Sequence, residues 1–140
     1  MSSFETIGEP GNLGAVTQFV RQAARSAAFD EEALLPVDLI VEEIFLNIAM
    51  HGYAGRPAGP VAILCASPEI GVLTIQFQDW AEAFNPLVDG HNPALDVPLS
   101  QRRAGGLGLV VVKNMAESMS YRRIDDRNEL SVRIVARRGG

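Results

Sequence analysis

The stretch EEIFLNIAMHGY, residues 42–53, decides how the chain is interpreted, because it places two polar residues inside an apolar helical pattern. At about 100° per residue, Glu43 and Asn47 lie within an arc that also holds Leu39 and Met50. A buried carboxylate without a partner is costly, so such a pair is either satisfied inside a core or opens onto a cavity with charge or water. The helix alone leaves both alternatives open.

Composition narrows the class of protein. A chain of 140 residues with 47% hydrophobic and 21% charged residues suits one globular domain, which we expect to span residues 1–140. Its apolar runs are too short to cross a bilayer, and its start has no secretory pattern. Cys65 is the single cysteine and is expected to be a buried hydrophobe. We therefore expect a cytoplasmic protein without membrane contact.

The charge pattern limits the partners. The net charge is −5, and the basic residues are dispersed apart from short pairs. Nucleic-acid binding proteins concentrate basic residues on one surface, so this pattern argues against direct nucleic-acid binding. A protein or a small molecule is the expected partner.

The chain contains both helical and strand patterns. Three segments have helical spacing, the last one after a glycine turn: residues 13–28, 36–50 and 104–119. In the second of these, proline is expected in the first turn. Four segments have strand patterns and pair as two hairpins: residues 61–66 with 71–78, and 120–125 with 129–138 across the turn 126–128. The pattern predicts an α+β fold with a mixed sheet covered on one side by about three helices.

A long irregular segment, residues 79–103, separates the two hairpins. Long loops in compact domains are often lids or binding segments, and we expect a lid over residues 88–103. Asp79 opens this loop directly after a strand. It is either a turn-initiating residue or a carboxylate that accepts a hydrogen bond from an exocyclic amine.

The loop runs into GGLGL at residues 105–109, directly before a helix. Glycines let the chain approach a phosphate, and a helix N-terminus presents unpaired N–H groups to it. A simple tight turn is the alternative. The spacing matches neither a Walker A loop nor a dinucleotide-binding fingerprint.

Three motifs follow one another in a particular order: EIFLNIAMHGY, DWAEAFNPL and GGLGLVVVKNMAESMSYRR. In this order and spacing, the chain resembles the histidine-kinase-like (GHKL) ATPase superfamily with the Bergerat fold. Within it, the chain is similar to the anti-sigma-factor serine/threonine kinases of bacteria. The resemblance covers nearly the whole chain and implies a two-layer α/β sandwich of the Bergerat type, with ATP and Mg²⁺ as cofactors.

The resemblance also implies roles for individual residues. Glu43 would act as the base toward the hydroxyl that receives the phosphate, and Asn47 would coordinate Mg²⁺ through its carbonyl oxygen. Asp79 would recognise the adenine amino group. Two residues later the family has a glycine, where this chain has Ala81. A Cβ at this position can obstruct the close approach of backbone and adenine.

Phosphate binding is implied for the glycine turn and the two arginines before it: Gly105, Gly106, Leu107, Gly108 and Leu109, with Arg102 or Arg103 neutralising charge. Arginine in a loop has an equally good explanation as a solvated residue.

The leading hypothesis is an ATP-dependent kinase that sequesters a sigma factor and phosphorylates a serine or threonine of an antagonist protein. A nucleotide-dependent binding module without kinase activity is the alternative, motivated by Ala81. An ATP-binding fragment of a sensor kinase ranks last, because this chain shows no phosphoacceptor helix. The resemblance further suggests a homodimer, to which the apolar stripe of the first helix could contribute.

Overall fold

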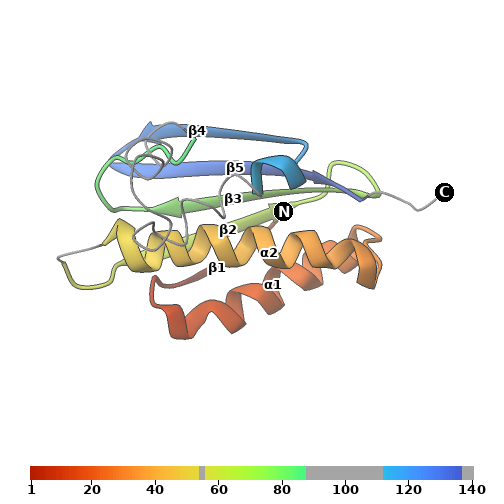
Figure 1. Cartoon of the computed structure of the whole chain (residues 1–140), viewed down its shortest axis with the longest axis horizontal. Helices are drawn as coiled ribbons and strands as arrows, with labels where there is room; N and C mark the ends of the chain where they lie inside the picture. Colours follow the sequence, from red (N-terminus) through yellow and green to blue (C-terminus); the bar gives the residue numbers. More distant parts are fainter. Residues whose placement is uncertain (54–55, 88–111, 137–140) are drawn as a thin grey trace, which may run out of the picture.

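The computed structural model describes residues 1–53, 56–87 and 112–136. In these ranges, no helix combines the length and the apolar character that crossing a bilayer requires. The described residues form two layers, a five-stranded sheet and a layer of helices on one of its faces (Figure 1).

The sheet has the strand order β1-β2-β3-β5-β4. The strands have the following bounds: β1 Ser2–Ile7, β2 Pro60–Ala66, β3 Val72–Asp79, β4 Ser118–Ile124 and β5 Arg127–Val135. All four described pairings are antiparallel, so the α+β two-layer sandwich is confirmed but its sheet is antiparallel rather than mixed. Short turns join β2 to β3 and β4 to β5, and tight turns allow only antiparallel neighbours.

Two long helices, α1 (Leu13–Ser26) and α2 (Glu31–Asn47), cover one face of the sheet. Short helical segments precede α1 and follow α2: η1 (Pro10–Asn12) and η2 (Ile48–Gly52). Of the expected third helix, residues 112–115 are described and are helical. Residues 104–111 lie outside the described residues. The expected helix end at residue 119 is wrong, because the chain leaves the helix after residue 115 and β4 begins at Ser118.

The start of α2 differs from the prediction, because the helix begins before Pro36 and carries the proline inside it. Asp30 caps the helix by accepting a hydrogen bond from the Ala33 N–H at 2.8 Å. An aspartate cap is a strong start signal. The N–H that proline lacks would have bonded the carbonyl of Glu32, which is exposed, so water can satisfy this carbonyl.

The core lies between the helices and the inner face of the sheet. The predicted apolar face of β3 is confirmed, since Leu73, Ile75 and Phe77 are buried there. Cys65 is buried as well, and burial raises the pKa of its thiol to about 12. This thiol therefore behaves as a small hydrophobe at physiological pH.

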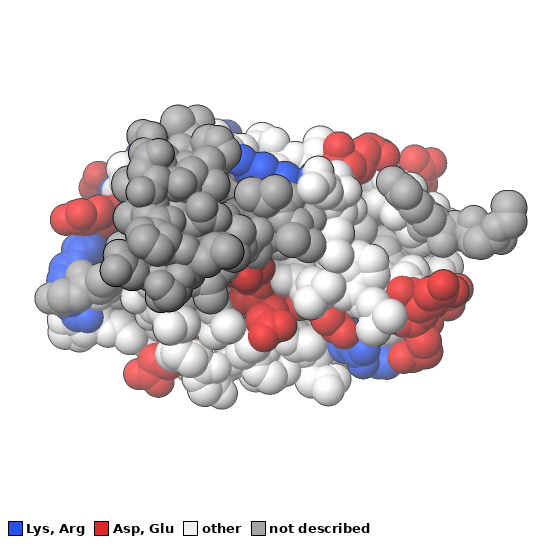
Figure 2. Space-filling view, viewed as in Figure 1, with Lys and Arg blue, Asp and Glu red and all other residues white. Residues whose placement is uncertain are grey.

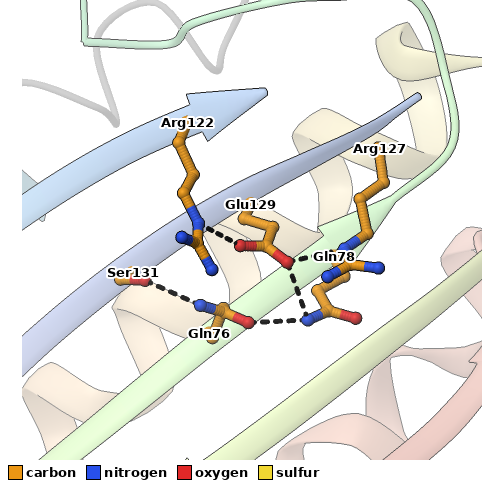
Figure 3. A network of polar contacts seen from close by, with 6 residues as sticks. All are labelled: Gln76, Gln78, Arg122, Arg127, Glu129 and Ser131. Carbon is orange, nitrogen blue, oxygen red and sulfur yellow. Dashed lines mark hydrogen bonds and ion pairs between the residues drawn. The ribbon is translucent and has the colours of Figure 1, made fainter. Parts of the chain in front are cut away.

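The outer face of the sheet carries polar side chains (Figure 3). Gln76 and Gln78 alternate with the core residues of β3 and point to this face. Glu129 of β5 is 1% exposed and lies at the centre of the network. Its carboxylate accepts hydrogen bonds from Arg122, Arg127 and Gln78.

Two strand features were not predicted. Strand β1 pairs along its length with β2, although most of its residues are exposed and give only a weak pattern. The closing hairpin turns at Asp125 and Asp126, both with positive φ (48° and 62°), rather than across residues 126–128. Two-residue hairpin turns require such angles. Because the turn is shorter, Asn128 lies within β5 and pairs with Asp79.

Candidate functional site

A pocket lies between the C-terminal end of α2 and the inner face of the sheet. The space within it is about 480 Å³ when the open solvent at its mouth is counted. Its lining is mostly apolar, with a few polar groups: Ile44, Asn47, Ile48, Gly52, Phe77, Asp79, Glu82, Phe84, Pro86, Tyr121, Asn128 and Leu130. A mostly apolar pocket with a small number of polar groups suits a partly polar small molecule.

Helix α2 brings Asn47 to the wall of the pocket and Glu43 one turn before it. Both residues are half-buried. The apolar pattern predicts that the arc around Glu43 lies inside the core. In the structure Leu39 and Met50 are 47% and 57% exposed, so this arc lies at the border of the core. Figure 2 shows acidic side chains at the surface over the middle of α2.

Glu43 has no hydrogen bond or ion pair with any residue that the structure describes. Partial burial raises its pKa, and the charge of Glu42 raises it further. A carboxylate in this state holds a proton more readily than a solvated one. Such a group is suited to accept a proton from a substrate hydroxyl.

The helix changes its geometry directly after Asn47. Residues Ile48–Gly52 form a π-helical turn, which is rare and is often found at functional sites. The wider turn continues α2 and places Ile48 and Gly52 in the pocket wall. Asn47 therefore lies where the α-helix passes into the wider turn.

Asp79 is the last residue of β3, is 7% exposed and lines the pocket. Burial raises the pKa of this carboxyl and outweighs the opposing hydrogen bonds from Asn128 and Ala81 and the charge of Arg123. Both hydrogen bonds go to Oδ1, at 2.8 Å from Asn128 Nδ2 and 3.1 Å from the Ala81 N–H. Oδ2 accepts none from the described part of the chain, so it can accept one from a ligand.

Two further side chains anchor the loop after Asp79. The Tyr53 hydroxyl accepts a hydrogen bond from the Trp80 N–H at 2.9 Å and donates to the Pro60 carbonyl at 2.7 Å. Arg123 donates to the Ala81 carbonyl at 2.7 Å. These bonds tie the loop to the end of the helix layer and to β4, so the base of the pocket has a defined shape without a ligand.

Ala81 is 2% exposed and belongs to the hydrophobic core. Its Cβ lies 3.6 Å from the position that a Cβ on Gly52 would occupy, which is ordinary contact. Ala81 is not one of the residues that line the pocket. The methyl group thus packs against the end of the helix layer, and the expected obstruction of adenine finds no support in this geometry.

Sequence reasoning missed Asn128. This residue is 5% exposed and bonds both the carboxylate of Asp79 and the loop that follows it. In the sequence, Asn128 is a polar residue in the turn predicted over residues 126–128, and this local pattern does not indicate a site residue. Its importance depends on its register opposite Asp79, which lies 49 residues earlier.

The implied phosphate-binding residues lie outside the described residues: Arg102, Arg103, Gly105, Gly106, Leu107, Gly108 and Leu109. The lid expected over residues 88–103 lies there too. Their roles stay predictions.

The donor set at the pocket fits a magnesium nucleotide. Among the described residues there is no group of three or more His, Cys, Asp and Glu side chains that could hold a metal by themselves. Magnesium bound with a nucleotide commonly takes one or two protein oxygens and completes its shell with phosphates and water. Asn47 can supply such an oxygen, and Asp79 can accept a hydrogen bond from a base amine.

The comparisons with known proteins agree with this geometry. The sequence profile of the histidine kinase-like ATPase domain matches residues 8–134. Among solved structures, the histidine kinase domain of a blue-light activated histidine kinase from Erythrobacter litoralis EL346 is similar, with a TM-score of 0.57 and 14% identity. The match covers 91% of this chain but 60% of that one, and it shows the fold alone. No curated protein matches the chain.

Proposed function

The chain belongs to the histidine kinase-like ATPase domain family, and from this premise we propose that it is an ATP-dependent serine/threonine protein kinase that acts as an anti-sigma factor. One observation carries the proposal. Glu43 and Asn47 lie one turn apart on α2, and Asn47 shares a pocket with the buried Asp79. Residues suited to bind a base and a metal therefore line one pocket, and Glu43, which is suited to accept a proton, lies one helical turn from Asn47 outside the pocket lining.

Each side chain has a distinct task in this proposal. Asp79 accepts a hydrogen bond from the adenine amine, and the apolar lining excludes water from the base. Asn47 would hold Mg²⁺ through its carbonyl oxygen, and the metal would neutralise charge on the phosphate oxygens. These contacts hold the nucleotide in place, and positioning supplies much of the catalysis in phosphoryl transfer.

The transfer step assigns the proton to Glu43. The substrate hydroxyl oxygen forms a bond to the γ-phosphorus, the bond between this phosphorus and the β,γ-bridging oxygen breaks, and ADP leaves. The hydroxyl proton passes to the Glu43 carboxylate. The raised pKa of Glu43 supports this assignment, because a base whose pKa lies closer to neutrality is a better proton acceptor.

The choice of protein substrate and partner rests on the family resemblance of the motifs. In this proposal the chain binds a sigma factor and phosphorylates an antagonist protein, which exchanges partners as a result. A nucleotide-dependent binding module without transfer is the second candidate, because Ala81 replaces the family glycine. The burial of Ala81 away from the pocket lining weakens the reason for this alternative.

The experiment incubates the purified chain with radiolabelled Mg-ATP and candidate antagonist proteins, and measures sigma-factor binding in parallel. Incorporation of phosphate into serine or threonine of an antagonist, abolished by EDTA, supports the kinase. Nucleotide binding and sigma-factor binding without incorporation support the binding module. Phosphate recovered on histidine would contradict the serine/threonine assignment.

A further inference from the structure

We propose that Asn128 is a positioning residue, which fixes the hydrogen-bond polarity of Asp79 and so makes the pocket select a base that donates a hydrogen at this point. The inference rests on the proposed function, since it takes the pocket to be the site of a nucleotide base. It adds a residue to the site and a rule for base selection.

Asn128 uses the full hydrogen-bonding capacity of its amide. Nδ2 donates to Asp79 Oδ1 at 2.8 Å and to the Glu82 carbonyl at 2.9 Å. Oδ1 accepts from the Phe84 N–H at 3.3 Å and from the Tyr121 hydroxyl. The side chain is 5% exposed, so solvent can replace these partners only poorly.

The backbone fixes the orientation of this amide. The carbonyl of Glu82 can only accept, and the N–H of Phe84 can only donate, so rotation of the amide by 180° would lose both bonds. Nδ2 must therefore face Asp79. The Ala81 N–H, a second donor, lies 3.1 Å from the same oxygen. Oδ1 of Asp79 is thus held by two donors.

This arrangement determines what the pocket can recognise. Asp79 lines the pocket, and its Oδ2 has no donor among the described residues. A base with an amine can therefore donate to it, whereas a base with an oxo group would set two acceptors against each other. Asn128 also holds the backbone of Phe84, whose side chain forms part of the apolar wall. One residue thereby positions both the polar and the apolar contact to the base.

The first test compares Mg-ATP with Mg-ITP, which carries an oxygen in place of the amino group. Calorimetry should show that the wild-type chain binds Mg-ATP at least about tenfold more tightly. In Asp79→Asn, the oxygen of the new amide must face the two donors, so its NH₂ faces the pocket. This variant should bind Mg-ITP more tightly than Mg-ATP.

The second test uses Asn128→Asp, which has the same shape. It keeps the acceptor for Phe84 and Tyr121, loses both donors and sets a second carboxylate against Asp79. Affinity for Mg-ATP should fall at least about tenfold near neutral pH and recover on mild acidification, when one shared proton restores the donor. Among the described residues, the other charged or titratable side chains nearby are Arg123, Tyr53, Tyr121 and Glu82.

The control is Glu129→Gln, which changes the neighbouring residue on the outer face and should leave the ATP/ITP ratio unchanged. A wild-type chain that binds neither nucleotide would refute the proposed function. If the wild type prefers ATP and Asp79→Asn keeps this preference, the inference is wrong while the proposed function stands. The same holds if Asp79→Asn loses both nucleotides equally. If thermal scans show that Asn128→Asp does not fold, the Asp79→Asn ratio decides; if it folds and binds ATP like the wild type, the inference is wrong.

Discussion

Two buried carboxylates lie on opposite faces of the sheet, one residue apart in the pairing of β3 with β5. Asp79 pairs with Asn128 and faces the pocket, whereas Glu129 pairs with Gln78 and faces outward. Both are almost inaccessible to solvent, at 7% and 1% exposure. Burial alone therefore does not distinguish a structural carboxylate from one that binds a ligand.

Their hydrogen-bond partners do distinguish them. Glu129 receives bonds on both oxygens, from Arg122 on one and from Arg127 and Gln78 on the other. Burial alone would raise its pKa, but the hydrogen bonds from the arginines and their charges lower it overall. From the part of the chain that the structure describes, Asp79 receives bonds on one oxygen, both from neutral groups, and burial raises its pKa. A carboxylate left with an unused acceptor in a pocket is the one to examine for ligand binding.

The largest expected effect is the loss of phosphate transfer when Glu43 is changed. Glu43→Gln should lower phosphate transfer to the antagonist by about 10²–10⁴-fold, because the amide cannot take the hydroxyl proton. Mg-ATP affinity should change little, since the shape is kept. Quantified transfer of radiolabelled phosphate gives the rate.

The matched control is Glu42→Gln, the exposed neighbour on α2, which removes the same charge outside the site. It should retain the wild-type rate. If Glu43→Gln transfers phosphate as fast as Glu42→Gln, Glu43 is not the base.

The second prediction contrasts the stability of variants on the two faces. Glu129→Gln should lower the free energy of unfolding by about 1–3 kcal/mol, because two buried charge-assisted hydrogen bonds are weakened. Arg122 is 64% exposed and can turn to solvent, which favours the lower end. Asp79→Asn keeps its partners and removes a buried charge, so its unfolding free energy should not fall. Urea unfolding followed by circular dichroism measures both, and equal losses would erase the contrast.

The pH dependence of stability should differ in sign between the two groups. Asp79 has a pKa above its ordinary 3.8, so the folded chain holds this proton more tightly and gains stability as the pH falls through the folded-state value. Glu129 has a pKa below its ordinary 4.5, so its contribution is present above that value and is lost as the pH falls through the folded-state pKa.

Melting temperatures from about pH 7 down to about pH 3 test these signs. On acidification, the wild type should gain stability relative to Asp79→Asn and lose stability relative to Glu129→Gln. Parallel curves for all three proteins would show that neither pKa shift is linked to folding.

The smallest expected effect is that of Ala81→Gly. The methyl group packs in the core and not in the pocket lining, so Mg-ATP affinity should stay within about twofold of the wild type. Stability should fall by about 1 kcal/mol, from the lost burial and the added freedom of glycine. A severalfold gain in affinity would show that the methyl group does obstruct the nucleotide.

Much of the fold could be predicted because its signals are local. The helical spacing around Glu43 and Asn47 and the alternation in β3 that ends at Asp79 were readable in short windows. The exposed strand β1 gave no such signal, since the pairing with β2 that stabilises it involves residues more than fifty positions away. The early start of α2 followed from a single cap at Asp30, which the proline signal obscured.

The site was predictable only in part for the same reason. The motif positions identify Glu43, Asn47 and Asp79, but the contacts that orient Asp79 come from distant parts of the chain. Asn128 acts through strand register, and the Tyr53 hydroxyl, at the end of η2, accepts a hydrogen bond from the Trp80 N–H. Both residues have ordinary local patterns, so only the three-dimensional structure reveals them.

The most direct measurement is a calorimetric titration of Mg-ATP into the wild type, Asp79→Asn and Glu129→Gln under one set of conditions. If the pocket carboxylate recognises the base and the outer one is structural, the wild type and Glu129→Gln bind with the same affinity. Asp79→Asn should then bind at least about tenfold more weakly. Equal affinities in all three proteins, or no binding by the wild type, would contradict the assignment of this pocket to ATP.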